Sequence, residues 1–249
     1  GNKGIVIDWS SPIEVSEASF NYIAQCPSPE IPTAKRLQYY VKFLEYPDEL
    51  ISNDAYGEFA NAPYKDITVL AEKMPVEKIR KWVTSKDTPQ TRLGLYGLLI
   101  GLCGNAKDAE SIKAKILENN DDFRLGIDGI VSGYLLLTGD KGLDVIDEHK
   151  LKNTKVPFSE TYAALQALRF MWRYGEGRIE KDRLRQSMRV LLDRPALTDM
   201  VIPDLSRWED WAVQDKLMGM YGKGEFNVPS IKRAIVRYML VSSKAIPED

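Results

Sequence analysis

The stretch RLGLYGLLIG at residues 92–101 returns thirty-two residues later as RLGIDGIVSG at residues 124–133. Each copy carries three glycines separated by steps of three and four residues, which place the glycines on one face of a helix. A face without side chains lets a neighbouring helix approach closely. Helical hairpins that repeat in this way bury their apolar faces only against one another. The repetition therefore predicts an all-α protein built as an α-solenoid, a superhelix of stacked helical hairpins.

Four glycines mark the predicted turns between paired helices. They lie 35, 36 and 47 residues apart, at Gly104, Gly139, Gly175 and Gly222. These intervals fall within or near the range of HEAT-like and related helical repeats. The tetratricopeptide alternative fits less well, because the Trp, Gly, Tyr, Ala and Pro signature of that family does not recur in register. We therefore expect about six hairpins of the HEAT-like class.

Apolar periodicity, prolines and cap residues predict the individual helices. The expected helices cover residues 14–25, 33–44, 48–59, 64–73, 76–84, 87–104, 106–117, 179–192, 206–221 and 230–242, with one more that begins near residue 121 and one that carries Ala164 and Ala167 in place of ridge glycines. Residues 1–12 include the apolar run Ile5-Val6-Ile7, and we expect them to be a tail or the remnant of an upstream segment. Residues 13–249 are expected to form one domain.

Residues 46–59 resemble the second helix of a HEAT-like repeat. Asp48 is a good N-cap, and Ile51, Ala55 and Phe59 follow it at three, seven and eleven positions. The whole chain resembles an uncharacterised bacterial family of exported HEAT-like proteins, through IDWS at 7–10, LEYPD at 44–48, DAY at 54–56 and IPDLSRWEDW at 202–211. The resemblance implies an extracytoplasmic protein whose targeting segment and upstream part are absent here. It implies no known activity.

The composition is that of an ordered, soluble chain. Of its 249 residues, 44% are hydrophobic and 28% are charged, and the net charge is -2. This balance argues against disorder and against a general nucleic-acid binder. No apolar run approaches the roughly 20 residues that span a bilayer, so we expect no membrane span. Cys26 and Cys103 are expected to be buried thiols, with one long-range disulfide as the alternative.

Signatures of catalysis are mostly absent. His149 is the single histidine and follows Asp147 and Glu148. A solvated helix end is therefore the favoured interpretation of this residue, and a histidine-based metal site is nearly excluded. No P-loop or dinucleotide fingerprint occurs, and we expect no cofactor and no metal. A pair of carboxylates could still hydrolyse a glycosidic bond, and the place to look is the set Glu209, Asp210 and Asp215 beside Trp208 and Trp211.

The strongest local charge lies between Arg169 and Arg194, where eight cations outnumber four carboxylates. Within it, four cations step by three and four residues and form one helical stripe, namely Arg178, Lys181, Arg185 and Arg189. Such a stripe can hold a carboxylate or a phosphate by bidentate hydrogen bonds. We take these four residues as the candidate partner-binding surface. The alternative is an ordinary solvated face paired with Glu180 and Asp182.

These observations predict a non-enzymatic scaffold that binds a protein partner, one with an acidic surface, through a concave or basic helical face. The alternative is an enzyme on a HEAT-like scaffold, either a carboxylate-dependent carbohydrate hydrolase or a nucleic-acid repair enzyme. A third hypothesis makes the chain the supporting half of a larger exported protein. Nucleic-acid binding is the least favoured of these because of the overall acidity.

Overall fold

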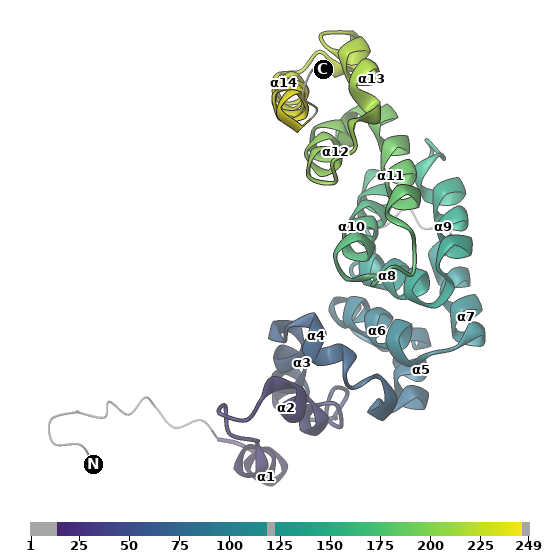
Figure 1. Ribbon diagram of the computed structural model, residues 1–249. Coiled ribbons are helices and arrows are strands. Elements are labelled where there is room, and N and C mark those ends of the chain that lie inside the picture. The colour runs from purple at the N-terminus through teal and green to yellow at the C-terminus, as the bar shows by residue number, and fades with distance from the viewer. Residues whose placement is uncertain (1–13, 119–122, 246–249) are drawn as a thin grey trace, which may run out of the picture. The chain divides into compact units, whose positions relative to one another are not determined.

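A computed structural model describes residues 14–118 and 123–245, and every regular element in this part of the chain is helical (Figure 1). The prediction of an all-α protein is thus confirmed. The chain divides into two compact units, of which the first runs to Pro75 and the second begins at Val76. Residues 1–12, for which a tail was predicted, lie outside the described residues. No helix in the described part is long and apolar enough to cross a membrane.

The N-terminal unit contains α1 (Glu17–Gln25), α2 (Thr33–Tyr40), α3 (Glu49–Asn61), α4 (Tyr64–Thr68) and a 3-10 turn (Ala71–Lys73). Asp48 caps α3 as predicted, because its carboxylate accepts a hydrogen bond from the Leu50 amide at 3.0 Å. The same carboxylate accepts hydrogen bonds from the hydroxyls of Ser16 and Ser19, which ties the start of α1 to the start of α3. The predicted apolar stripe of α3 is fully buried, at Ile51, Ala55 and Phe59.

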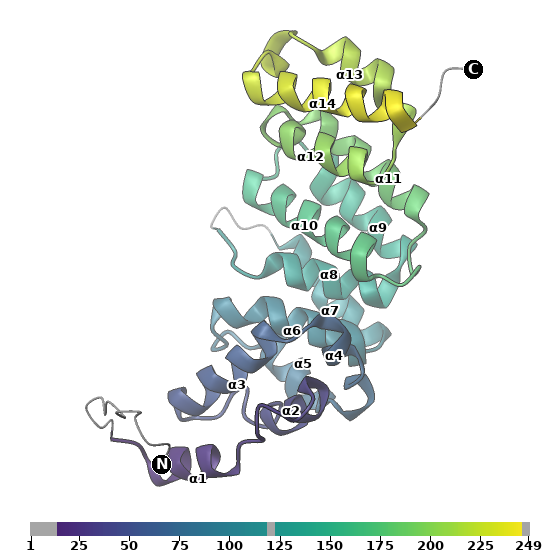
Figure 2. The same ribbon diagram turned by 60° about the vertical axis from the view of Figure 1, so that its left-hand side comes forward.

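The C-terminal unit contains α5 (Val76–Thr84), α6 (Gln90–Cys103), α7 (Ala106–Leu117), α8 (Ile127–Thr138), α9 (Asp140–Ile146), a π-helical turn (Asp147–Leu151), α10 (Phe158–Tyr174), α11 (Lys181–Val190), α12 (Pro195–Arg207), α13 (Gln214–Met220) and α14 (Pro229–Ala245), with 3-10 turns at Leu191–Asp193, Trp211–Val213 and Gly224–Phe226. Within this unit the helices α6, α8, α10, α12 and α14 lie on one side, and α7, α9, α11 and α13 lie on the other (Figures 1 and 2). The chain thus alternates between two layers of helices.

The two glycine faces predicted from the sequence contact each other, α6 against α8. A Cβ atom added at Gly133 would lie 1.9 Å from the Gly97 carbonyl oxygen, and one added at Gly129 would lie 2.2 Å from the Gly94 carbonyl oxygen. These are backbone atoms, which cannot move aside as a flexible side chain can. Gly126 differs from its counterpart Gly94, because it precedes α8 in a left-handed conformation with φ of 75°. The helix that was expected to begin near residue 121 therefore begins at Ile127.

The expected helix at 206–221 is wrong. Residues 195–207 form α12, and α13 begins only at Gln214. Pro195 occupies the first turn of α12, where its missing amide costs nothing, but Pro203 lies inside the helix. Two shorter corrections concern the N-terminal unit, where α2 ends at Tyr40 rather than at residue 44 and the segment 64–73 splits into α4 and a 3-10 turn.

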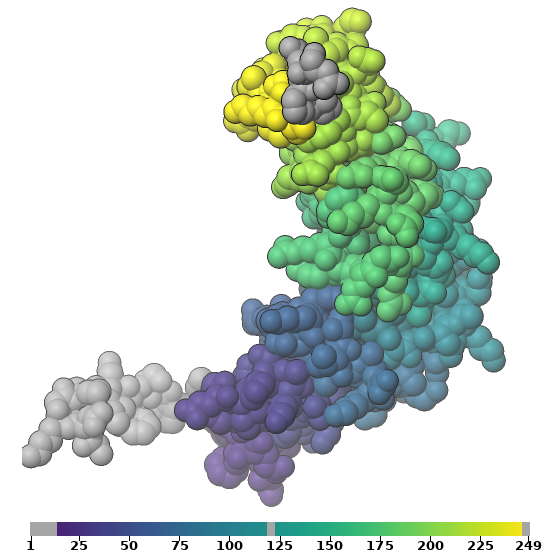
Figure 3. All heavy atoms as spheres, in the orientation of Figure 1, coloured from purple at the N-terminus to yellow at the C-terminus, as the bar shows by residue number. Residues whose placement is uncertain are grey.

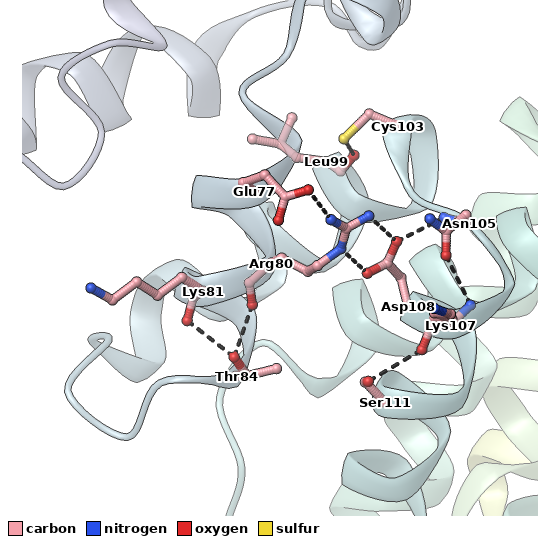
Figure 4. Close-up of polar contacts among 10 residues, drawn as sticks. All are labelled: Glu77, Arg80, Lys81, Thr84, Leu99, Cys103, Asn105, Lys107, Asp108 and Ser111. Carbon is pink, nitrogen blue, oxygen red and sulfur yellow. Dashed lines mark hydrogen bonds and ion pairs between the residues drawn. The ribbon is translucent and has the colours of Figure 1, made fainter.

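A buried carboxylate joins α5 to α7 (Figure 4). The guanidinium of Arg80 donates to both oxygens of Asp108, with an Nη2–Oδ2 distance of 2.9 Å, and also to exposed Glu77. Asp108 is 3% exposed and accepts a further hydrogen bond from the Asn105 amide, while the Asn105 side chain caps α7. The hydrogen bonds from Arg80 hold the pKa of Asp108 below its ordinary value.

Both cysteines are free thiols. The Sγ of Cys103 donates to the Leu99 carbonyl at 3.1 Å, and burial raises the pKa of Cys103 to about 11. The disulfide that the sequence left open is therefore not formed, and the two thiols are half-buried rather than fully buried.

Replacing Gly133 by Ala will destabilise the C-terminal unit by about 3 kcal/mol, because the new methyl group must push two helix backbones apart. Urea unfolding followed by circular dichroism measures this loss. Gly219→Ala in α13 is the matched control: nothing lies within 4 Å of an added Cβ there, so a gain of roughly 0–1 kcal/mol from helix propensity is expected. Equal stability of the two variants would contradict the packing described here.

Acidification will remove the stabilisation contributed by Asp108. Because its pKa is lower in the folded than in the unfolded chain, the contribution is present above the unfolded value, about 3.9, and is lost as the pH falls below it. Urea midpoints between pH 7 and pH 3 should therefore fall more steeply in the wild type than in Asp108→Asn, which at pH 7 loses about 2 kcal/mol. Glu77→Gln, at an exposed partner of Arg80, should retain the wild-type slope.

Candidate functional site

Two adjoining hollows lie along α10, α12 and α14 of the C-terminal unit. The first, of about 590 Å³, lies between α10 and α12 and includes Arg169, Arg173 and Arg207. The second, of about 470 Å³, lies between α12 and α14 and includes Arg207, Arg233 and Arg237. They share Arg207, so they form one surface, which we call the arginine groove. The space-filling view shows α14, in yellow, beside α12 at the C-terminal end of the unit (Figure 3).

The helices present these arginines because their opposite faces are buried. On α10, Leu165 and Leu168 are fully buried, whereas Arg169 and Arg173 stand four residues apart beside the hollow. Residues four apart on a helix are neighbours, with roughly 5–6 Å between their Cβ atoms. On α14 the same spacing occurs at Arg233 and Arg237, and the core face carries buried residues such as Ile231, Ile235 and Tyr238.

One buried carboxylate organises the middle of the groove. Asp204 is 4% exposed and receives two guanidiniums, from Arg169 with an Nε–Oδ2 distance of 2.7 Å and from Arg207 with an Nη2–Oδ1 distance of 2.8 Å. Arg169 also donates to the Gln166 side chain at 2.9 Å. A single carboxylate neutralises only one of these two cations, so the pair keeps a net positive charge.

The remaining arginines of the groove are less engaged. Arg173 lies over the Tyr174 ring at 5.1 Å, and no hydrogen bond or ion pair joins Arg233 or Arg237 to another residue in the described part of the chain. The lining of the two hollows contains five arginines against Asp199 and Asp204, a net charge of 5 minus 2, or +3. Guanidiniums in this arrangement can grip carboxylates or phosphates through paired hydrogen bonds.

The stripe predicted from the sequence lies on and just before α11, and its cations contact other parts of the molecule. Arg178 donates to the Leu136 carbonyl at 2.8 Å, and Lys181 lies over the Trp172 ring at 5.0 Å. Arg185 donates to the Trp208 carbonyl, and Arg189 pairs with Asp210 through two hydrogen bonds of 2.7 and 2.6 Å. Binding of a partner through these four residues stays a prediction, but any such partner must compete with these contacts.

Two of the residues considered for glycosidic hydrolysis, Asp210 and Trp208, are buried against other side chains. Asp210 is 3% exposed and paired with Arg189, so it is not free to act as an acid or a base. Trp208 is 5% exposed, and one face of its ring is covered by Trp172, with ring centroids 4.2 Å apart. His149 is exposed on the π-helical turn, as expected for a solvated helix end. Among the described residues, no cluster of His, Cys, Asp and Glu could hold a metal ion.

The arginine groove was not predicted from the sequence, although the spacing of its arginine pairs can be read there. The pairs Arg169/Arg173 and Arg233/Arg237 each have helical spacing, but they belong to helices more than fifty residues apart. Only the packing of α10, α12 and α14 brings them to one surface.

Arg189→Glu will destabilise the protein by about 3 kcal/mol, because it leaves the buried carboxylate of Asp210 without its cation and adds a like charge. Lys181→Glu, on the same stripe, should cost only about 0.5–1 kcal/mol, since it removes a cation–π contact at an exposed position. Urea unfolding distinguishes the two. Similar small losses in both would show that the stripe is solvated.

No family model, no curated protein and no solved structure matches this chain. Inference about its function therefore rests on the geometry of the site.

Proposed function

We propose that this protein is a non-enzymatic interaction scaffold that binds an acidic segment of a protein partner along the arginine groove. The observation that carries the proposal is the set of guanidiniums on three helices, of which Arg233 and Arg237 have no partner in the described part of the chain. Their electrostatic attraction to an acidic ligand is not offset by an ion pair that binding must first break.

The arrangement of the C-terminal unit supports the same proposal. Its helices alternate between two layers, which is the organisation of HEAT-like solenoids (Figure 1). The arginine groove runs along α10, α12 and α14, which belong to one layer. Solenoids bind through extended surfaces of this kind. We propose the HEAT-like class for this unit on that basis.

The chemistry of the groove favours a carboxylate-rich peptide over nucleic acid. The groove carries a local charge of +3, but the chain as a whole carries -2. Nucleic acid gains its affinity from many phosphate contacts, whereas the groove offers five guanidiniums. A short acidic segment, by contrast, matches the groove in both charge and extent.

A fluorescent oligoglutamate peptide serves as the probe, with binding followed by fluorescence polarisation at several salt concentrations. Replacing Arg233 and Arg237 together by Glu should weaken binding by about tenfold or more, because two charge-assisted hydrogen-bond donors are lost. Both side chains are exposed, so the variant is expected to fold. Lys223→Glu with Lys244→Glu is the control, with the same change in net charge at exposed positions outside the groove.

If both double variants weakened peptide binding equally, net charge alone would explain the loss, and the proposed site would be contradicted. A single-stranded oligonucleotide that binds the groove more tightly than the peptide would move the protein to the class of nucleic-acid binders.

A further inference from the structure

The N-terminal unit holds an aromatic pocket that is independent of the arginine groove. Its volume is about 430 Å³, within the roughly 300–1,000 Å³ of small-molecule sites. The residues Tyr22, Tyr39, Phe43 and Tyr46 form its aromatic wall, and Glu17, Asn21 and Gln25 of α1 form a polar rim. We call this set of seven residues the aromatic cup.

The four rings are inclined to one another and form a concave wall rather than a flat platform. Phe43 lies at the centre, with its ring centroid 4.9 Å from Tyr22, 4.9 Å from Tyr39 and 5.7 Å from Tyr46. The corresponding interplanar angles are 77°, 46° and 58°. A flat sugar ring stacks best on one open ring face, whereas a compact rounded group can contact several inclined rings at once.

Hydrogen bonds fix two of these rings in place. The Tyr22 hydroxyl donates to Asp54 at 2.7 Å, and the Tyr39 hydroxyl donates to the Tyr22 carbonyl at 2.8 Å. Burial and the nearby Asp54 carboxylate raise the pKa of Tyr22, so its ring stays neutral. The wall is therefore preorganised, and a ligand need not order it on binding.

The rim carries polar side chains that have no hydrogen-bond or ion-pair partner among the described residues. Glu17, Asn21 and Gln25 follow one another at steps of four on α1, and all three are exposed. No hydrogen bond or ion pair joins their side chains to another described residue. Glu17 is the one charged group among the residues that line the pocket.

The net charge of the N-terminal segment favours a cation. Residues 14–62 contain eight carboxylates against three basic residues, a net charge of 3 minus 8, or -5. This contrasts with the arginine groove, where the local charge is positive. Aromatic rings beside a carboxylate, here Glu17, in a segment of net negative charge attract organic cations by cation–π and Coulomb interactions.

We propose that the aromatic cup binds a quaternary ammonium compound that carries a hydroxyl or ester oxygen, of the choline type. The methyl groups of such a cation contact Tyr39, Phe43 and Tyr46, the charge faces Glu17, and the amides of Asn21 and Gln25 reach the oxygen. A primary ammonium is more strongly hydrated than a quaternary one, so it loses more hydration free energy on entering an aromatic site. The quaternary group combines charge with apolar methyls, which matches the lining.

Titration of the full chain with choline chloride, followed by NMR of the tyrosine ring signals, tests the proposal. We expect saturable binding with a Kd of about 1 mM, since a few cation–π contacts supply the affinity. The probe 3,3-dimethyl-1-butanol has the same shape without the charge and should bind at least about tenfold more weakly. Equal binding of the two probes, or no saturable shift with choline, overturns the proposal.

Two variants locate the site. Tyr46→Ala, at a residue 38% exposed, should weaken choline binding at least about fivefold, and Glu17→Gln about threefold. Glu14→Gln is the matched control, because Glu14 is exposed just before α1 and does not line the pocket. Since Glu17 is exposed and unpaired, its variant tests the site even if Tyr46→Ala does not fold. If Glu17→Gln binds choline with the wild-type affinity, the proposed role of Glu17 in facing the cation is wrong.

Both a free solute and a lipid headgroup present this cation. Cosedimentation with phosphatidylcholine vesicles, competed by free choline, would identify the headgroup as the ligand. Choline binding without cosedimentation would identify the free compound.

Discussion

The contact between the backbones of α6 and α8 is the constraint on which the C-terminal unit depends. Gly97 and Gly133 leave no room for a methyl group, so the backbones of the two helices are in direct contact. That approach fixes α6 and α8 as a rigid pair. The pair then sets the position of α5 and α7, whose buried link between Arg80 and Asp108 spans the hairpins on one side, and of α10, which packs on the other face of α8.

Farther along the chain the helices contact each other through side chains rather than backbone. The ridge of α10 carries buried Ala164 and Ala167 where earlier helices carry glycine. Between α10 and α12 the contact is made by the stacked rings of Trp172 and Trp208 and by the ion pair of Arg169 with Asp204. Large side chains separate backbones and leave a hollow beside them. The arginine groove therefore occurs where the glycine ridge has ended, and the change in ridge residues explains its place in the fold.

The sequence predicted the bounds of those helices that begin next to a proline or a capping residue. The bounds of α5 and α7 agree with the sequence analysis because Pro75 and Asn105 define their starts. The helix α12 was missed because it contains Pro203, and a proline inside a segment is typical of a helix end rather than of a helix interior. Contacts between residues distant in sequence also limited the prediction of the partner-binding stripe. Helical spacing correctly placed Arg185 and Arg189 on one face, but their acceptors, Trp208 and Asp210, lie more than twenty residues away in sequence.

A recurring pairing of buried carboxylates with arginines explains which cations remain available to a partner. Arg80 binds Asp108, Arg124 binds Glu160, Arg169 binds Asp204 and Arg189 binds Asp210, and each carboxylate is at most 4% exposed. The pairs of Arg80 with Asp108 and of Arg169 with Asp204 each join two helices, whereas Arg124 lies before α8 and Asp210 lies after α12. An unpaired carboxylate at such a depth would cost several kcal/mol, roughly 3–5. These pairs therefore fix which helix faces which, at little gain in net stability. Arg233 and Arg237 pair with no carboxylate in the described part of the chain, so they carry no such structural constraint and remain available to the proposed ligand.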